Sequence, residues 1–262
     1  MSPVGTPEIF DIGRVMSRMF GVLQRNFATF LPLAMILAGA PAAVVGFAQG
    51  MITSSGTHAG DAGMAITGLI FLGGAVLGWI TNVILQGAVI HGTVNDLAGR
   101  GTNFGDSFGA GVSHILPLIG VGIVAVLAIG FGFILLIVPG VLLALAWTVS
   151  APVVVMERRG VFGAFARSAE LTRNHRAPIF GLWLIFSIAG FILQMIIGVF
   201  TFGTAAVASS NAMLVGVVQA ASALVLQTIT SMVGSAGVAS IYYELRQIKE
   251  GVGAEQLASL FD

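Results

Sequence analysis

The sequence predicts an all-α integral membrane protein with six transmembrane helices. Only 8% of the 262 residues are charged and 56% are hydrophobic, whereas a soluble domain carries roughly 25% charged residues. No Asp, Glu, Lys or Arg occurs in four long stretches, 27–60, 62–95, 107–156 and 177–243. A spanning helix needs about 20 apolar residues. The first two stretches therefore hold one helix each, and the last two hold two each.

The turn residues and the charges place the six helices along the chain. The expected spans are Thr29–Gly50, Met64–His91, Ile115–Val138, Val141–Met156, Pro178–Phe202 and Ala212–Tyr243. Pro139 and Gly140 separate the third span from the fourth, because this pair favours a turn. Pro41 lies inside the first span, where we expect it to kink the helix.

The basic residues predict the orientation. All eleven Lys and Arg residues lie before span 1, between spans 2 and 3, between spans 4 and 5, or after span 6. Short loops rich in Lys and Arg stay in the cytoplasm, so both termini are predicted to be cytoplasmic. A polar segment of about 25 residues precedes the first span, which argues against a cleavable signal peptide.

A short internal repeat precedes each odd-numbered span. Pro32, Pro117 and Pro178 each fall in the first turn of such a span, where the missing N–H of proline has no helical partner to lose. We therefore expect a single membrane domain of three parallel modules, each an interfacial amphipathic helix followed by a two-span hairpin. The alternative is that proline and basic residues recur before any helix that enters from the cytoplasm. The modules cover residues 1–92, 93–157 and 158–250, their amphipathic helices cover 9–26, 103–113 and 161–176, and residues 251–262 form a short cytoplasmic tail.

Arginines on and beside these helices are the candidate contacts with anionic lipid headgroups or with a protein partner. In the first helix, Val15 and Met19 fall on one side and Arg14 and Arg18 on the other, a pattern typical of a helix lying in the headgroup boundary. The full candidate set is Arg14, Arg18, Arg25, Arg158, Arg159, Arg167, Arg173 and Arg176.

Two alternatives for these arginines stay open. The first is that they only set the orientation of the chain. The second concerns the loop between spans 4 and 5, where Glu157 and Glu170 are placed to pair with Arg159 and with Arg167 or Arg173. In that case the loop is a structural clasp rather than a lipid contact.

Five amide side chains are the most polar groups within the predicted spans: Asn82, Gln86, Gln194, Gln219 and Gln227. They lie on ridges of small residues spaced four apart, such as Gly74 and Gly78 before Asn82. Small residues and interhelical hydrogen bonds are what hold helices together in lipid, so we expect these amides to pack helices. The alternative is that they line a solute path or bind lipid headgroups.

Several function classes are excluded or disfavoured. A net charge of zero gives no electrostatic case for nucleic-acid binding, and the absence of cysteine removes a thiol nucleophile and thiolate metal ligands. The four histidines are scattered, and a metal shared by His91, Asp96 and His114 is disfavoured because interfacial histidines are ordinarily anchors. We therefore expect neither a metal site nor a cofactor, and no enzyme activity.

One segment resembles a known family. The strings Val138-Pro139-Gly140, 151–157 (APVVVME) and 166–172 (ARSAELT), with Gly160 between the last two, resemble the bacterial multi-pass family that includes the membrane domain of some glycerophosphodiester phosphodiesterases and its uncharacterised stand-alone relatives. The resemblance implies a bacterial inner-membrane protein linked to lipid or envelope physiology. Only about twenty residues follow the last span, so the phosphodiesterase activity of that family is not expected here.

The function predicted from the sequence is non-enzymatic. We expect a homo-oligomeric protein that interacts with or organises anionic phospholipids, or an additional protein partner, at the cytoplasmic face of the inner membrane. The alternative is a passive channel or transporter for a small or apolar solute. Coupled transport is disfavoured because ionisable residues are absent from the predicted spans.

Overall fold

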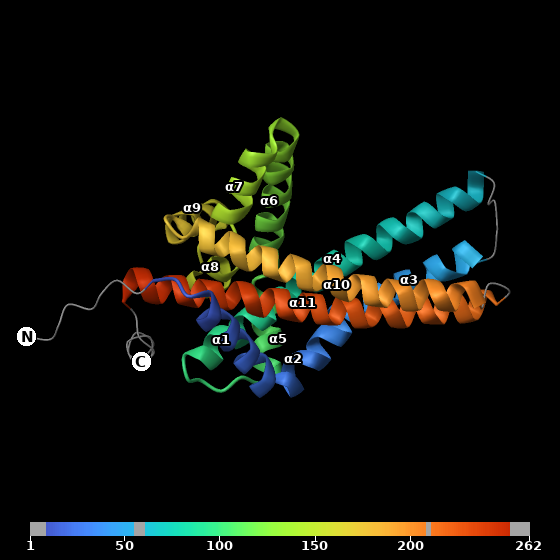
Figure 1. The fold of residues 1–262 in the computed structure, drawn as a ribbon, viewed down its shortest axis with the longest axis horizontal. Helices are drawn as coiled ribbons and strands as arrows, with labels where there is room; N and C mark the ends of the chain where they lie inside the picture. The colour runs from blue at the N-terminus through green and yellow to red at the C-terminus, as the bar shows by residue number, and fades with distance from the viewer. Residues whose placement is uncertain (1–8, 55–60, 208–210, 252–262) are drawn as a thin grey trace, which may run out of the picture.

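The computed structural model describes residues 9–54, 61–207 and 211–251, and all regular secondary structure in these ranges is helical (Figure 1). Six helical segments are long and apolar enough to cross a membrane, as predicted. They are Phe27–Ile52, Phe71–Leu97, Ile115–Leu135, Ile137–Glu157, Arg176–Thr204 and Ala212–Glu250. The predicted tail from residue 252 onward lies outside the described residues.

The first span is interrupted by a π-helical turn. It consists of α2 (Phe27–Ala34), η1 (Met35–Gly39) and α3 (Ala40–Ser54). Pro41 lacks an N–H and cannot bond to the carbonyl four residues back, so the backbone just before it widens, and the N–H of Ala40 donates to the carbonyl of Met35. Pro41 therefore perturbs the helix as expected.

Spans 1 and 6 touch backbone to backbone. A Cβ on Gly50 of α3 would lie 2.7 Å from the Cα of Gly216 in α11 (Ala212–Glu250), and one on Gly46 would lie 2.9 Å from the carbonyl oxygen of Gln219. Only glycine permits this approach, which brings many atoms of the two helices into dispersion contact. Gly46 and Gly50 therefore pack α3 against α11.

The helix α11 is longer than a bilayer requires. Its 39 residues span about 58 Å at 1.5 Å per residue, nearly twice the ~30 Å of a hydrocarbon core. The sequence placed its end at Tyr243, but the helix continues to Glu250. Its final turns carry Tyr242, Glu244 and Glu250, which contact charged residues of other helices. α4 (Asp61–Leu97) is similarly long, with 37 residues.

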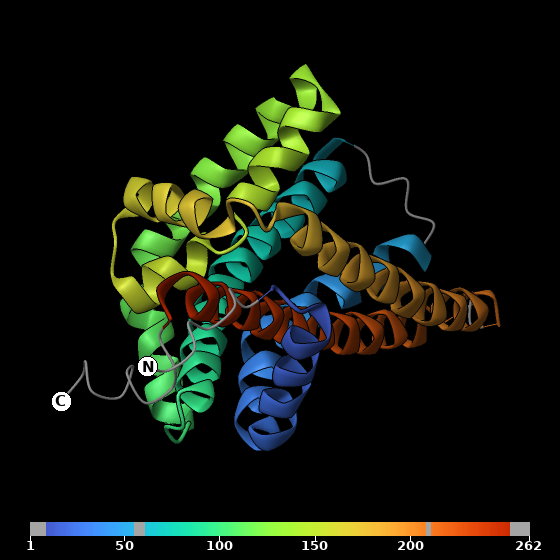
Figure 2. The ribbon, with the colours of Figure 1, turned by 60° about the vertical axis from the view of Figure 1, so that its left-hand side comes forward.

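Spans 3 and 4 form a hairpin that points away from the other spans. α6 (Ile115–Leu135) and α7 (Ile137–Ala146) diverge from α3, α4, α10 (Arg176–Val207) and α11 in Figures 1 and 2. The turn lies at Leu136, which is extended (φ −163°, ψ 148°), and not at Pro139 and Gly140. The predicted turn is wrong because Pro139 occupies the first turn of α7, where the missing N–H costs no helical hydrogen bond.

A short helix precedes each odd-numbered span. α1 (Ile12–Arg25), α5 (Phe104–Ser113) and α9 (Val161–Thr172) lie where amphipathic helices were predicted. The first two break from their spans at Asn26 and His114, which share nearly the same backbone conformation. The third breaks at Asn174, in the left-handed region with φ 72°.

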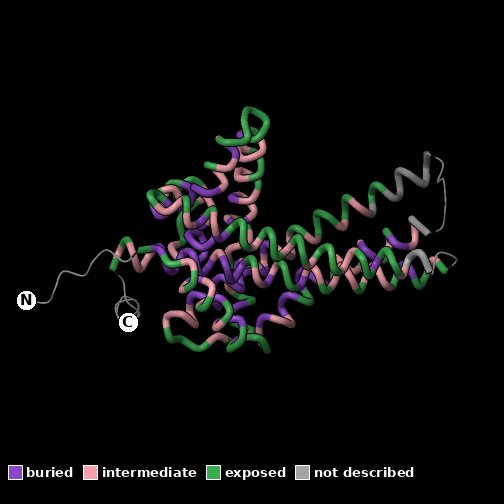
Figure 3. Tube along the Cα trace, in the orientation of Figure 1, coloured by how far each residue is buried: buried purple, intermediate pink, exposed green. Residues whose placement is uncertain are grey.

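The apolar face of α1 packs on protein rather than on lipid. Val15, Met19 and Val22 are fully buried, in clusters that include residues of α4 and α11. The expectation that this face enters the headgroup boundary is wrong for these residues, because apolar side chains of α4 and α11 cover them. Ile9 and Phe20 remain exposed. Figure 3 shows the buried residues gathered where α1 meets α11, while α10 is exposed along most of its length.

Candidate functional site at the charged end of the helices

A fully buried carboxylate, Glu244 of α11, is held by two arginines of α1. Its Oε1 lies 3.0 Å from Nε of Arg14, and its Oε2 accepts a 2.5 Å hydrogen bond from Nη1 of Arg18. The guanidinium of Arg18 also lies 5.3 Å from the ring centroid of Tyr243. A buried carboxylate must be paired, so the clasp of α1 on α11 depends on both arginines.

A second cluster surrounds Glu157 at the end of α8 (Ser150–Glu157). Arg159 and Arg167 approach its Oε2 at 3.0 and 3.2 Å, and the hydroxyl of Tyr242 donates to its Oε1 at 3.1 Å. Arg167 also pairs with Glu170 at 3.1 Å and with Glu250 of α11. The predicted clasp of Glu157 and Glu170 thus forms, and it ties α8 and α9 to α11.

These pairs keep the guanidinium of Arg167 protonated. Burial lowers the pKa of Arg167. The hydrogen bond with Glu170 and the charge of Glu157 raise this pKa by more than burial lowers it, so it lies above the ordinary value. Arg246 completes the cluster by pairing with Glu250 at 2.7 Å.

A third cluster lies at Asp96, near the end of α4. Arg25 of α1 donates to Asp96 from Nη2 at 2.5 Å, and Nδ2 of Asn26 donates at 2.8 Å. The hydrogen bond with Asp96 raises the pKa of Arg25. The hydroxyl of Tyr243 donates to the carbonyl of Leu97 at 3.1 Å, which links α4 to α11. The three clusters together define what we call the charged end.

Two hydroxyl side chains of α9 form hydrogen bonds with the backbone where the helix of span 4 is interrupted. α7 and α8 are separated by residues 147–149, so carbonyl and N–H groups there lose helical partners. Ser168 donates to the carbonyl of Ala146 at 2.8 Å and accepts from the N–H of Val149 at 3.2 Å. Thr172 donates to the same carbonyl at 3.2 Å. The string 166–172 therefore has a structural role, in clasping the broken span.

The structure separates the eight candidate arginines into two groups. Arg14, Arg18, Arg25, Arg159 and Arg167 form ion pairs with carboxylates of the chain. For Arg158, Arg173 and Arg176, the described residues provide no ion pair or side-chain hydrogen bond. Only this second group keeps its charge available for a ligand.

The intramembrane amides are divided as well. Asn82 of α4 donates to the hydroxyl of Ser231 in α11 at 2.7 Å, and Gln227 donates to the same oxygen at 3.0 Å. Gln86 and Gln219 are partly buried, whereas Gln194 is exposed on α10. Asn82 thus joins α4 to α11, as the packing interpretation expects, whereas the hydrogen bond of Gln227 lies within α11.

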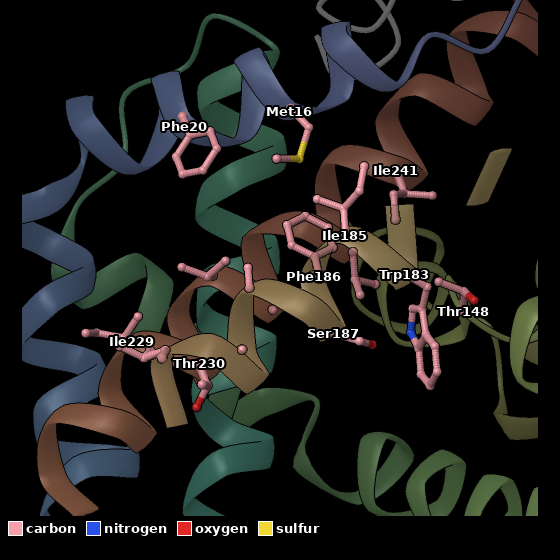
Figure 4. A pocket seen from close by; sticks show the side chains of 16 residues that line it. Met16, Phe20, Thr148, Trp183, Ile185, Phe186, Ser187, Ile229, Thr230 and Ile241 are labelled. Atoms are coloured by element: carbon pink, nitrogen blue, oxygen red, sulfur yellow. The ribbon is translucent and has the colours of Figure 1, made fainter. Parts of the chain in front are cut away.

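An apolar groove of about 430 Å³ runs between α10 and α11 beneath α1 (Figure 4). Trp183 and Phe186 of α10, Ile229 and Ile241 of α11, and Met16 of α1 are among the residues that line it. Gly190 and Gly234 also line the groove, and their missing side chains leave part of its space. Span 5 forms one wall of the groove, and only 6% of the residues in its most apolar segment are buried. The groove therefore faces the region that lipid would occupy.

Two bacterial membrane proteins are similar to this chain. It is 34% identical over 113 residues to a UPF0259 membrane protein of Pectobacterium carotovorum, a match covering 42% of this chain and 45% of that protein. It is 32% identical over 126 residues to a UPF0259 membrane protein of Photorhabdus laumondii, covering 47% and 48%. The chain spans about half the length of the curated relatives it matches. No family model and no solved structure matches it.

The relatives and the six apolar helices together identify a multi-pass integral membrane protein. The names of the relatives state a membrane location and no activity. Neither name refers to glycerophosphodiester phosphodiesterases, so the resemblance to the membrane domain of that family stays an expectation.

Glu244 is the site residue that sequence reasoning missed. The predicted span ends at Tyr243, where the charge-free stretch ends, and no role was predicted for Glu244, the next residue. Two features of the sequence could have indicated it. A carboxylate follows two tyrosines in Tyr242-Tyr243-Glu244, and two arginines spaced four apart lie on the amphipathic helix before span 1.

Proposed function

We propose that this protein has no catalytic activity of its own and binds anionic phospholipid along α10, beside the charged end, on the cytoplasmic side of the bacterial inner membrane. One observation carries the proposal. The apolar groove on α10 lies along the helix that begins at Arg176, and neither Arg176 nor Arg173, three residues before it, forms an ion pair with a carboxylate of the described residues. The apolar groove suits the acyl chain of a phospholipid, and the arginines suit its phosphate.

Arg173 and Arg176 supply the charge for the headgroup. With Asn174 and Ala177 they line a hollow of about 400 Å³ at the start of α10. Guanidinium groups bind phosphate through paired N–H donors. A basic residue beside an anionic leaflet contributes about 1 kcal/mol to membrane attraction.

The groove supplies the surface for an acyl chain. Trp183 follows Arg176 by seven residues of uninterrupted helix, so the two side chains lie on one face about 10 Å apart along the axis. A phosphate held at Arg176 thus has an acyl chain directed along α10 towards Trp183 and Phe186. The occupant we propose is therefore a phospholipid with an anionic headgroup.

The paired arginines have a structural task in this proposal. Arg14, Arg18 and Arg25 fix α1 over α11 and α4, and α1 in turn closes one side of the groove through Met16 and Phe20. The candidate lipid contacts are thereby reduced to Arg173 and Arg176, with Arg158 facing a different pocket.

The topology belongs to the same proposal. We propose that both termini are cytoplasmic, that the chain consists of three modules of short helix and hairpin, and that it forms a homo-oligomer. The ion pairs that bring α1, α9 and the end of α11 together support a common side for these segments. Reporter fusions at residues 1 and 262 test the topology, because cytoplasmic termini give fluorescence with a green fluorescent protein fusion and no alkaline phosphatase activity.

Native mass spectrometry of the purified protein tests the lipid proposal. We expect the wild-type protein to retain phosphatidylglycerol in preference to phosphatidylcholine, and Arg173→Gln with Arg176→Gln to remove the preference. The matched control is Arg25→Gln with Arg159→Gln, which removes the same charge from exposed side chains whose carboxylate partners keep other donors. Equal retention of both lipids by the wild-type protein would contradict the proposal.

The alternative of a passive pathway for a solute draws less support. Asn82 and Gln227, two of the amides that would line such a path, meet at Ser231 between α4 and α11. Flux of small solutes through proteoliposomes is the measurement that separates a pathway from a lipid-binding role.

A further inference from the structure

A second pocket, unlike the lipid groove, opens between α4, α5 and α8. It has a volume of about 800 Å³ and is lined mainly by polar side chains, among them His91 and Asn95 of α4, Asp106 of α5, and His114 and Arg158 at the adjoining turns. Its volume lies within the ~300–1,000 Å³ of small-molecule sites. None of its residues lines the groove on α10.

Arg158 occupies an unusual backbone conformation at the rim of this pocket. It ends α8 with φ 50° and ψ 32°, in the left-handed region where glycine is the ordinary residue. Glycine would adopt this conformation with less strain, so the arginine side chain here comes at a conformational cost. Observed backbone strain of this kind points to a functional side chain.

The charges around the pocket favour an anion over a cation. Of the two carboxylates that line it, Glu157 is neutralised by arginines, while Asp106 has only an amide and a backbone N–H as partners and keeps its charge, against the two cations Arg100 and Arg158 of the same lining. Glu157 accepts from Arg159, Arg167 and Tyr242, and Asp106 accepts from Asn103. The guanidinium of Arg158 has no such partner among the described residues.

Two histidines and an amide add further polar groups to the lining of the pocket. The imidazole of His91 lies 3.2 Å from the amide of Asn95, so one orients the other. Nδ1 of His114 lies 2.9 Å from the carbonyl of Ala110. Because a carbonyl oxygen only accepts, Nδ1 carries a proton there, and Nε2 of His114 is the ring nitrogen left to face a ligand.

We propose that this pocket is a binding site for a phosphate-bearing molecule, with Arg158 as the principal anion-binding residue and His91, Asn95 and His114 as polar contacts. Arg100 is a further cationic residue of the lining. The shared chemistry is a phosphate group, which either a water-soluble phosphate ester or a lipid headgroup supplies. The inference is independent of Arg173 and Arg176 and so goes beyond the lipid site.

The variant Arg158→Gly tests this site without endangering the fold. Glycine adopts φ 50° readily, so the variant removes the guanidinium and relieves the backbone at once. We expect its melting temperature to equal or exceed that of the wild-type protein. The matched control is Arg159→Gln, which removes the neighbouring charge while Glu157 keeps Arg167 and Tyr242.

Two arms distinguish the sources of phosphate. In nanodiscs of phosphatidylcholine, glycerol 3-phosphate is titrated and binding is measured by isothermal titration calorimetry. In the second arm, retention of phosphatidylglycerol by the purified protein is measured, with Arg173→Gln and Arg176→Gln present in every variant so that the groove site is disabled.

The proposal predicts that Arg158→Gly lowers binding at least tenfold in one of the two arms, while Arg159→Gln leaves it within about twofold. Loss in the first arm assigns a soluble phosphate ester, and loss in the second assigns a lipid headgroup. If a folded Arg158→Gly protein matches the wild type in both arms, or if neither arm detects binding, the proposal is overturned. A failure of the groove site alone leaves these outcomes unchanged, so the two proposals fail separately.

Discussion

Replacement of Glu244 by glutamine is the sharpest test of how α1 is held on α11. Glutamine keeps nearly the same shape and removes the charge that Arg14 and Arg18 share. The apolar contacts of Val15 and Met19 are untouched by this change. Any loss of stability therefore reports the ion pairs alone.

The magnitude follows from the burial of the three groups. Removal of one partner of a buried ion pair costs about 3–5 kcal/mol. Arg14 and Arg18 keep 31% and 22% of their side-chain surface exposed, so water solvates part of the charge that is left behind. We therefore expect Glu244→Gln to lower the free energy of unfolding by about 2–3 kcal/mol, below the range for full burial.

A double-mutant cycle isolates the pair. Unfolding of the wild-type protein, Arg18→Gln, Glu244→Gln and the double variant is followed in mild detergent by tryptophan fluorescence. We expect a coupling free energy of about 1–2 kcal/mol. Arg25→Gln is the control, because Arg25 is 59% exposed, and an exposed pair contributes only about 0–1 kcal/mol.

Cysteine labelling shows whether α1 also moves. The chain has no cysteine, so Met19→Cys introduces a unique thiol at a fully buried position of α1. We expect slow modification by maleimide in the otherwise wild-type protein and faster modification with Glu244→Gln. Zero coupling in the cycle, together with unchanged labelling, would refute the role assigned to the ion pairs.

Three further substitutions test the helix contacts. Gly50→Val places a side chain 2.7 Å from the backbone of Gly216, and we expect unfolding measurements to show a loss of about 1–3 kcal/mol; a neutral result would mean that α3 and α11 are not in contact. Ser168→Ala leaves the N–H of Val149 without its acceptor, so we expect the free energy of unfolding to fall by about 1–3 kcal/mol and the loop at 158–160 to be cleaved faster by protease. Unchanged proteolysis would argue against the role of α9 in holding the interrupted span 4. Asn82→Leu removes a hydrogen bond within the membrane and is expected to cost about 0.6–1.7 kcal/mol, whereas a stable variant that abolishes solute flux would favour a transport role.

The membrane helices were predictable because composition decides them. Charge-free stretches longer than 30 residues leave no alternative to spanning helices, and each predicted span overlaps an observed one. Their ends were less predictable, because local sequence does not specify whether a helix continues past the membrane. α11 extends to Glu250 because Tyr242, Glu244 and Leu245 are covered by other helices there.

Proline positions illustrate why local signals mislead. Pro139 with Gly140 favours a turn, yet the chain turns three residues earlier at Leu136 and uses Pro139 inside α7. A proline is equally acceptable at a turn and in the first turn of a helix. Only the packing of Gly140 against Phe133 in the finished hairpin distinguishes the two.

The sequence predicts which group of arginines contains the candidate site, but not which members of the group belong to it. The sequence places eight arginines near one side, but it does not reveal which of them meet a carboxylate. Glu244, Glu157 and Asp96 come from three different helices and capture five of the eight. Tertiary pairing therefore decides which arginines stay available for a ligand.

Quenching of Trp183 by brominated lipid tests the central claim most directly. Trp183 lines the groove, and the other two tryptophans, Trp79 and Trp147, can be replaced by phenylalanine to leave it as the only emitter. Lipids brominated on the acyl chain quench a tryptophan that they touch. We predict that brominated phosphatidylglycerol quenches Trp183 at a lower mole fraction than brominated phosphatidylcholine, and that Arg173→Gln with Arg176→Gln abolishes the difference. Equal quenching by the two lipids in the protein with both arginines intact would contradict lipid binding at this site.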